Sequence, residues 1–529
     1  MPDRSGTRLS GKSCSVVAIF IALIVCLATA GCQRRQRRPD QILFAVESNP
    51  TTLDPRIGVS EVTQHIYEMM FNSLVRRDEN FQYAPDLAER WETPDPRTFI
   101  FHLRPNVRFH NGKLLTSADV RYTLESLRRL ATPKAGSFSK IAAIDTPDDR
   151  TVIFRLTEPY LEFMVNLVRP AIGIVPDGSP DDFSRNPIGT GPFRFVRFAQ
   201  DDEVELQAFD QYFGGAPTIP SLVFRVIPDE TTRALELRNG SIDIVLNSLS
   251  PDMVFSLKEQ PHLQVENGPG TRYQYLAFNF RDTTLARPEV RRAIAHSLDR
   301  DNVIRHLFRG LARPADSIFP PFHWAYHKPS VQYAYDPARA RRLLDEAGFP
   351  DPDQEGPRTR FRLVYKSSNV NQSVELAQII QEQLHKVGVG LDIRTYEIAT
   401  VLADIRRGNF QLYSLRWIGA NLFTDIFSFV FHSKMAPPAG ANRGYYSNAE
   451  VDRLVDQANL TTDQEERAQI FNRLQDLVAA DLPYVSLLYP DNVVVFNKRL
   501  KGIRLIPSGD YIFLQGASIQ QDGAESGQP

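Results

Sequence analysis

The sequence is 529 residues long, three to four times the ~150 residues of a typical domain, so we expect two or more packed lobes. Hydrophobic residues make up 42% of the chain and charged residues 23%, which excludes a wholly disordered chain and a polytopic membrane protein. The 61 Lys and Arg residues nearly balance the 63 Asp and Glu residues, and the net charge of -2 provides no general positive field. Nucleic acid is therefore not expected as a partner.

The first 40 residues have the pattern of an export signal. A basic start is followed by an apolar run over residues 16–30, and Gly31-Cys32 comes next. This run fits the apolar region of a signal peptide better than a ~20-residue membrane span. Small residues before a cysteine resemble a lipoprotein processing box, although Thr29 stands where an aliphatic residue is usual. We predict a lipoprotein signal peptide over residues 1–31, lipid on Cys32 and a basic tether over residues 32–40.

Two alternatives for this segment are an uncleaved membrane anchor and a signal without lipid. Each of them also places the body of the protein outside the cytoplasm. The three cysteines, Cys14, Cys26 and Cys32, all precede that body. Structural disulfides, cysteine-ligated zinc and thiol catalysis are thereby excluded from residues 33–529.

The first half of the body alternates short strands with helices. A buried strand is predicted over residues 42–46, and turn chemistry at residues 50–55 ends it. Ser117 is predicted to cap a helix over residues 118–130. The other predicted elements of this half are strands over residues 98–103, 151–156 and 224–227, a β-rich stretch from residue 193, and a helix over residues 231–238 that ends at Asn239-Gly240.

The second half continues in the same style. It is predicted to contain helices over residues 287–304, 336–348 and 373–387, and strands over residues 361–365 and 389–396. This order predicts an α/β fold with mixed sheets, and excludes a helical bundle or a β-sandwich. The polar tail, residues 520–529, is expected to be disordered.

Several motifs identify a family resemblance. Residues 84–91, with 99–104, 107–112 and 117–120, resemble the signature of family 5 extracellular solute-binding proteins, the dipeptide-, oligopeptide- and nickel-binding components of ABC importers. Further motifs follow in the family's order over about residues 41–505: Thr52-Leu-Asp-Pro55, Pro187-Ile-Gly-Thr-Gly-Pro-Phe193, Tyr212-Phe-Gly-Gly215, Leu276-Ala-Phe-Asn279, Pro288-Glu-Val-Arg-Arg-Ala-Ile294, Tyr335-Asp-Pro337 with Leu343-Leu-Asp-Glu-Ala-Gly-Phe349, and Asp481-Leu-Pro483.

The resemblance implies a two-lobed, periplasmic-binding-protein-like fold of the large class with an extra N-terminal subdomain. Lobe I would comprise residues 41–270 plus 491–519, and lobe II residues 271–490. Two crossings between the lobes would let them close on a solute by hinge rotation. A ligand held between them is buried on both sides, and its binding energy offsets the cost of closure.

The implied function is solute capture outside the cytoplasm. A membrane-anchored, monomeric lipoprotein would bind a peptide-like or other polar organic solute and deliver it to the membrane permease subunits of an ABC importer. No cofactor, no metal and no enzymatic activity are expected, since hydrolase and nucleotide-binding motifs are missing from the sequence. An extracytoplasmic hydrolase acting on peptides or glycans is the alternative.

Two charged groups that bind peptide termini in relatives look altered. In dipeptide and oligopeptide binders, a Trp-x-x-Asp motif supplies a carboxylate to the ligand's ammonium group, but the matching run, Trp417-Ile-Gly-Ala-Asn421, has Ala420 at that position. Near residues 365–369, where dipeptide binders place an arginine for the ligand carboxylate, only Lys366 is charged. A buried ammonium that lacks its counter-charge loses ~2–5 kcal/mol, so simple dipeptides are expected to bind poorly.

Other side chains remain as candidates for solute contact. They combine flat apolar surface with hydrogen-bonding groups: Tyr273, Tyr275, Asn279, Arg416, Trp417 and Asn421. Tyr275 and Asn279 fit equally well as interior strand residues. The pair His323 and His327 favours a surface loop over a metal site, because nearby prolines oppose a helix.

Two groups of residues are assigned structural roles. Gly189 and Gly191 are expected where the backbone needs a positive φ or a close approach, and a phosphate-binding loop is disfavoured there. An aromatic and aliphatic set is predicted to be core without solute contact: Trp91, Phe99, Phe101 and Leu103.

Overall fold

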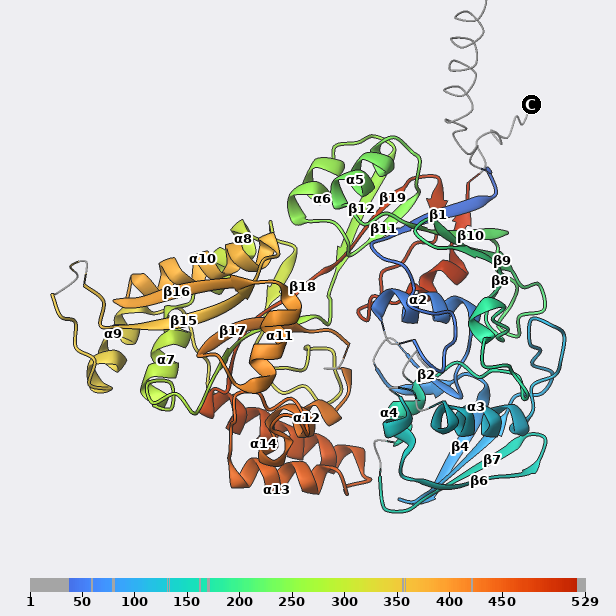
Figure 1. Cartoon of the computed structure of the whole chain (residues 1–529), viewed down its shortest axis with the longest axis horizontal. Coiled ribbons are helices and arrows are strands. Elements are labelled where there is room, and N and C mark those ends of the chain that lie inside the picture. The colour runs from blue at the N-terminus through green and yellow to red at the C-terminus, as the bar shows by residue number, and fades with distance from the viewer. Residues whose placement is uncertain are drawn as a thin grey trace, which may run out of the picture. The chain divides into compact units, whose positions relative to one another are not determined.

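The computed structural model describes residues 38–58, 60–78, 81–130, 132, 134–160, 163–168, 172–353, 356, 358–419 and 422–520 (Figure 1). The chain divides into a short unit of residues 1–41 and a large unit of residues 42–529. The predicted signal peptide, Cys32 and most of the basic tether lie outside the described residues, as do residues 521–529 of the tail. None of the described helices is both long and apolar enough to cross a membrane.

The first β-strand lies in the interior of a seven-stranded sheet. Its order is β12-β19-β11-β1-β10-β9-β8, and β1 runs parallel to β11. Alternate residues of β1 enter two cores, one covered by α2 and one by α5 and α6, so both faces of the strand are buried. The strands of this sheet are β1 (Gln41–Val46), β8 (Phe193–Ala199), β9 (Glu203–Ala208), β10 (Ser221–Val226), β11 (Ile244–Leu246), β12 (Leu263–Gly268) and β19 (Asn492–Asn497).

A separate antiparallel sheet follows α2 in the sequence. Its order is β4-β5-β7-β6, and it packs against α3 and α4 around a third core. The expected strands 98–103 and 151–156 are confirmed. These elements are β4 (Ala88–Asp95), β5 (Thr98–Leu103), β6 (Ile141–Asp148), β7 (Thr151–Leu156), α2 (Glu61–Met70), α3 (Ser117–Arg129) and α4 (Phe163–Val168); a hairpin of β2 (Val75–Arg77) and β3 (Tyr83–Pro85) lies beside them.

The predicted helix cap at Ser117 was wrong by one residue. Ser117 is the first residue of α3, and Thr116 precedes it in extended conformation. The backbone N–H and the hydroxyl of Thr116 both donate to the buried carboxylate of Asp119, at 2.7 and 3.0 Å. A carboxylate at the third position of a helix caps the helix in this way, since it accepts hydrogen bonds from the residue that precedes the first turn.

The second half of the chain forms a six-stranded mixed sheet of order β14-β18-β13-β17-β15-β16. One face packs against α7, α9 and α10, and the other against α11, α12, α13 and α14. Figure 1 shows α11 beside β17 and α12, α13 and α14 gathered together. The strands are β13 (Tyr273–Phe278), β14 (Ala312–Pro314), β15 (Phe361–Ser368), β16 (Val389–Tyr396), β17 (Leu412–Trp417) and β18 (Tyr484–Pro490).

One long predicted helix, residues 287–304, is two helices in the structure. α7 ends at Ser297, Leu298 is extended, and the Asp299 side chain accepts from Asn302 N to start α8. A short polar residue competes well for that capping position, which breaks the helix. The remaining helices are α5 (Glu230–Arg238), α6 (Pro251–Leu257), α7 (Pro288–Ser297), α8 (Arg300–His306), α9 (Pro337–Glu346), α10 (Asn371–His385), α11 (Ile398–Arg407), α12 (Asp425–Phe431), α13 (Ala449–Ala458) and α14 (Gln464–Asp481).

Of the two reasons considered for the glycine pair, the structure shows close approach. A β carbon at Gly189 would lie 2.0 Å from the Met70 carbonyl oxygen, and one at Gly191 would lie 2.4 Å from the Met70 carbonyl carbon. Neither glycine has a positive φ. The pair therefore lets its segment pack directly onto the end of α2.

The chain passes from the seven-stranded sheet to the six-stranded sheet between β12 and β13, and returns between β18 and β19. The two passages touch: a β carbon at Gly270 would lie 2.2 Å from the Pro490 carbonyl oxygen. Asn267 Nδ2 also donates to the Asp491 carboxylate at 2.7 Å. The predicted lobe boundaries, 270 and 490, fall at these passages, and these exact bounds stay a prediction.

Candidate functional site

Four of the predicted site residues lie on two neighbouring strands. β13 and β17 pair antiparallel, with Tyr273 opposite Trp417 and Gln274 opposite Arg416. Because side chains alternate along a strand, Tyr273, Tyr275 and Trp417 share the face covered by α11 to α14, and Arg416 points to the other face. The sequence prediction thus brought together residues that are more than 140 positions apart.

Trp417 forms part of an aromatic stack. Its ring centre lies 6.2 Å from that of Tyr275, with the planes 14° apart, and 6.3 Å from that of Phe429. The guanidinium of Arg443 lies 5.4 Å from the indole centre. Trp417 is half-buried, and its buried Nε1 has no hydrogen-bond partner among the described residues. The indole is thus held by its aromatic neighbours and by Arg443, and not by a hydrogen bond of Nε1 to a described residue.

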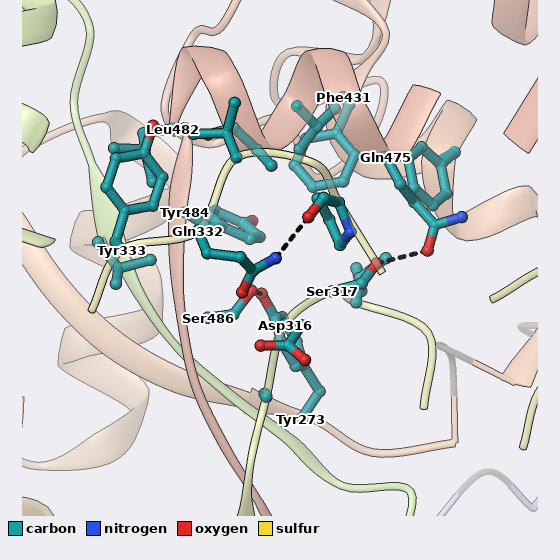
Figure 2. A pocket seen from close by; sticks show the side chains of 18 of the residues that line it. Tyr273, Asp316, Ser317, Gln332, Tyr333, Phe431, Gln475, Leu482, Tyr484 and Ser486 are labelled. Atoms are coloured by element: carbon teal, nitrogen blue, oxygen red, sulfur yellow. Dashed lines mark hydrogen bonds between the residues drawn. The ribbon is translucent and has the colours of Figure 1, made fainter. Parts of the chain in front are cut away.

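Tyr273 and Tyr275 are interior residues, which agrees with one of the two interpretations of Tyr275. Only 2% and 1% of their surfaces are exposed. The Tyr273 hydroxyl and Ser486 Oγ share a hydrogen bond of 2.7 Å. Tyr273, Ser486, Tyr484 and Phe431 are among the residues that line a cavity of about 50 Å³. Figure 2 shows these side chains. This cavity is far smaller than the ~300–1,000 Å³ of a typical ligand pocket.

Arg416 is a half-buried cation whose partners are both neutral. Its Nε donates to Gln274 Oε1 at 2.5 Å, and its Nη2 donates to Gln372 Oε1 at the start of α10. Burial and the neighbouring Arg272 lower the pKa of Arg416 to about 10. No carboxylate in the described part of the chain forms an ion pair with it. Since burial of an uncompensated charge is costly, the position favours an incoming anion.

The other predicted contacts are placed differently or not described. Asn279 is buried, and its amide donates to the carbonyl oxygens of Gly408 and Phe410 at 3.1 and 2.8 Å. Its side-chain oxygen accepts from Arg281 N. Asn421 and the neighbouring Ala420 lie outside the described residues. Asn279 therefore supports the chain at residues 408–410, which precede Trp417 at the end of β17 by at least seven positions.

Lys366 is the one charged residue of the segment 365–369, where dipeptide binders place an arginine for the ligand carboxylate, and it already forms an ion pair within the protein. Its ammonium is buried against the Asp404 carboxylate on α11 and lies 5.5 Å from the Tyr396 ring centre. The lysine beside it holds the pKa of the Asp404 carboxyl below its usual range. In this arrangement Lys366 joins β15 to α11.

A second pocket, of about 510 Å³, was not predicted. It is lined by the β2-β3 hairpin, the β4-β5 turn, α4, and residues Leu422 and Thr424, which follow β17 in the chain. Phe99, Phe101 and Leu103 are buried as expected. Trp91 packs against the same core but is only half-buried, and it lines this pocket together with Phe99. Trp324 and Leu422 line the same pocket. Two of the chain's three tryptophans at one pocket are the signal that sequence analysis missed.

The histidines at 323 and 327 do not converge on a site. His323 is 4% exposed and stacks on Phe319 at 4.4 Å, so a surface loop was the wrong interpretation for it. Burial and Arg77 lower the pKa of His323 to about 3, which keeps the ring neutral. His327 pairs with Asp476 at 3.4 Å.

Another cluster joins α2 to the C-terminal segment. Ligand-type atoms of His65, Glu68 and Asp510 lie within 4.8 Å of one another. Burial and Asp510 raise the pKa of Glu68 to about 7, while Glu68 and Glu61 hold the pKa of the buried His65 well above its usual value. The titrations of His65 and Glu68 are therefore coupled. Tyr511 N–H also donates to Glu68 at 2.8 Å.

Comparisons with known proteins agree with the geometry. A family model described as bacterial extracellular solute-binding proteins, family 5 Middle, matches residues 82–436. The dipeptide-binding protein of Escherichia coli K12 is 26% identical over 97% of this chain and 100% of its own length. The glutathione-binding protein of Pectobacterium atrosepticum is 28% identical over 89% of this chain and 93% of its own.

A solved structure shows the same fold. The protein NikZ of Campylobacter jejuni, in complex with Ni(L-His), aligns with a TM-score of 0.75 and 26% identity over 91% of this chain and 100% of its own. The predicted two-lobed fold class with mixed sheets is thereby confirmed.

Proposed function

Because the chain belongs to family 5 of the bacterial extracellular solute-binding proteins, we propose that it captures a peptide-like or other polar organic solute for an ABC importer. The match of relatives over nearly their whole length carries this proposal, since they include a dipeptide-binding and a glutathione-binding protein. The same matches favour binding over the hydrolase alternative.

In this proposal the end of β17 meets the solute. Trp417 offers an aromatic surface, Arg416 a cation without an acidic partner, and Asn421 a hydrogen-bonding amide. Tyr273 and Tyr275 support the indole from the sheet, and Asn279 holds the chain at residues 408–410. The 510 Å³ pocket beside Leu422 has the volume of a site for a small organic molecule.

Ala420 stands where relatives with the Trp-x-x-Asp motif have a carboxylate, so some solutes of those relatives are expected to bind this protein poorly. Without a carboxylate at this position, a free ammonium terminus lacks the partner that the Trp-x-x-Asp motif provides. Unmodified di- and tripeptides should therefore be weaker ligands than peptides with a blocked amino terminus.

Membrane anchoring and localisation belong to the same proposal. After signal cleavage, Cys32 would carry the lipid, and the arginines of residues 33–40 would lie near an anionic membrane surface. The protein would act as a monomer, held outside the cytoplasm close to the permease subunits.

A thermal-shift screen tests the proposal. A solute at 100 times its Kd raises the free energy of unfolding by ~2.7 kcal/mol, which gives a visible rise in melting temperature. The screen should include free, N-acetylated and amidated di- and tripeptides, glutathione and nickel–histidine. We expect a saturable rise with at least one blocked or larger compound, and a much smaller one with free dipeptides. A large shift with simple dipeptides would contradict the argument from Ala420, and no shift with any compound would contradict solute capture by this class.

A further inference from the structure

A buried polar cluster lies behind Trp417 on the six-stranded sheet. The hydroxyls of Tyr413 and Tyr484 are buried and have no hydrogen-bond partner in the described chain, and the same is true of Trp417 Nε1. Tyr413 is fully buried and Tyr484 is 7% exposed. Buried polar groups are paired in the great majority of cases, so three unpaired atoms in one region require an explanation.

The three atoms belong to one group of touching rings. Tyr275 stacks on Tyr484 at 4.1 Å on one side and on Trp417 at 6.2 Å on the other, and its ring meets Tyr413 edge-on at 6.1 Å. These residues come from β13, β17 and β18, which are adjacent strands. The rings that carry the three unpaired atoms thus all neighbour the ring of Tyr275.

Arg443 brings a positive charge to the same place. Its guanidinium lies over the Trp417 ring at 5.4 Å. Burial alone would lower the pKa of Arg443, but the hydroxyls of Tyr275, Tyr413 and Tyr484 together outweigh burial and raise it. No carboxylate within the described residues forms an ion pair with Arg443. Burial and the neighbouring hydroxyls keep the pKa of Tyr275 well above its usual value, so the tyrosines stay protonated.

Hydrogen-bond donors predominate in this cluster. An indole N–H and a guanidinium only donate hydrogen bonds, and a protonated tyrosine hydroxyl donates one and can also accept. The missing partner is an acceptor with several lone pairs, and a carboxylate has two oxygens that accept from such donors at once. A water molecule supplies two lone pairs but no charge to balance Arg443.

We infer that Tyr413, Tyr484, Trp417 and Arg443 form a subsite for the carboxylate of the bound solute. The inference rests on the proposed function and names the solute class: an organic acid that presents its carboxylate, not an ammonium, near Trp417. It agrees with Ala420, since the residue that would bind an ammonium is missing from the same loop. The missing carboxylate at residue 420 and the unpaired donors beside Arg443 both favour a negatively charged end of the ligand at this point, where relatives with the Trp-x-x-Asp motif bind a positively charged one.

Sodium acetate is the probe for this subsite. Melting temperatures of the intact protein are measured over a concentration series of acetate, with sodium chloride at equal ionic strength and acetamide, the neutral isostere, as reference compounds. We expect acetate to raise the melting temperature by about 1–2 °C at saturation, and acetamide and chloride to have little effect.

Variants locate the effect. Arg443→Gln should lower the affinity for acetate at least ~tenfold, and Tyr413→Phe and Tyr484→Phe should each lower this affinity severalfold. Both Phe variants should melt no lower than the parent in chloride, because each removes an unpaired buried hydroxyl. Tyr333→Phe is the matched control, since its hydroxyl donates to the Ala479 carbonyl, and its acetate response should equal that of the parent.

Three results would overturn the inference. One is an acetate response that is no larger than that of chloride, and another is an equal response in the parent and in Arg443→Gln. The third is a loss of stability in both Phe variants without acetate, which would show that the hydroxyls bind water in the folded protein. If a solute still binds in the screen, only the subsite fails; if acetate binds at the cluster but no solute does, the proposed function fails instead.

Discussion

Tyr273 and Trp417 are paired residues on β13 and β17, and both side chains lie on the sheet face that α11 to α14 cover. Trp417 is therefore attached to the core on one side while its indole remains half-buried at the end of the strand. A role in the core and a role in the site are not exclusive for this residue, because the same ring can serve both.

Replacement of Trp417 should affect stability and binding together. Trp417→Ala should lower the free energy of unfolding by ~2–4 kcal/mol, because contacts with Tyr275 and Phe429 are lost. The same change should lower the affinity for the solute by about thirtyfold. Trp417→Phe keeps a ring in the stack and should retain most of the stability. Thermal melts without solute and calorimetry with solute separate the two effects. An Ala variant that melts like the parent and binds normally would place Trp417 outside both core and site.

The contact between the two passages that link the sheets should be sensitive to a single methyl group. Gly270→Ala would put its β carbon 2.2 Å from the Pro490 carbonyl oxygen, so the passages must separate, and we expect a loss of ~2 kcal/mol or more. Gly268→Ala is the matched control, because a β carbon there meets nothing within 4 Å. Denaturant unfolding of the two variants gives the comparison. Equal stabilities would show that the passages do not depend on this close approach.

Local patterns identified most of the secondary structure. The strands at residues 98–103, 151–156 and 389–396 were predicted with correct ends, because alternation and turn residues define them within a few positions. The break between α7 and α8 was missed, since helical periodicity continues through Leu298 and only the side chain of Asp299 marks the new start. Such a cap competes with helix continuation at the level of ~1 kcal/mol, which periodicity does not resolve.

The candidate site was predictable only where a family motif marks it. Trp417 and Arg416 lie together with Tyr273 and Tyr275 because their strands pair, and the motif identified the strand end. Arg443 and Tyr484 were missed, since they reach this place from a loop and a strand far along the chain. Glu68 and Asp510 were missed for the same reason, as no local spacing connects residues so distant in the sequence.

Stability should fall as the pH rises through the range in which Glu68 titrates. Its folded-state pKa, about 7, is above its ordinary value of 4.5, so the folded protein keeps a proton that the unfolded chain has lost. This contribution is complete below pH 4.5 and is lost as the pH approaches 7 and above; the raised pKa of His65 acts in the same direction.

Glu68→Gln should flatten this profile. The amide carries no titrating proton, so the fall in stability between pH 4.5 and 8 should shrink by on the order of 2 kcal/mol. Urea unfolding at several pH values measures it, with Glu346→Gln, an exposed residue on α9, as the control. A variant with the same slope as the parent would show that Glu68 does not hold the proton.

Lipid anchoring is tested by Cys32→Ser in the full chain. The parent should be found in the membrane fraction with the mass of a processed, acylated protein, because each buried methylene contributes ~0.8 kcal/mol to anchoring. The Ser variant should be released into the soluble extracytoplasmic fraction. A variant that stays in the membrane at the unprocessed mass would favour an uncleaved N-terminal anchor.

The central claim is that the chain binds one solute and leaves it chemically intact. Native mass spectrometry of the protein with the strongest compound from the screen, followed overnight, tests this most directly. The account predicts a persistent complex of one chain and one solute, in which the mass of the solute does not change. Complete absence of a complex, or the appearance of a solute fragment at the expense of the parent compound, would contradict it.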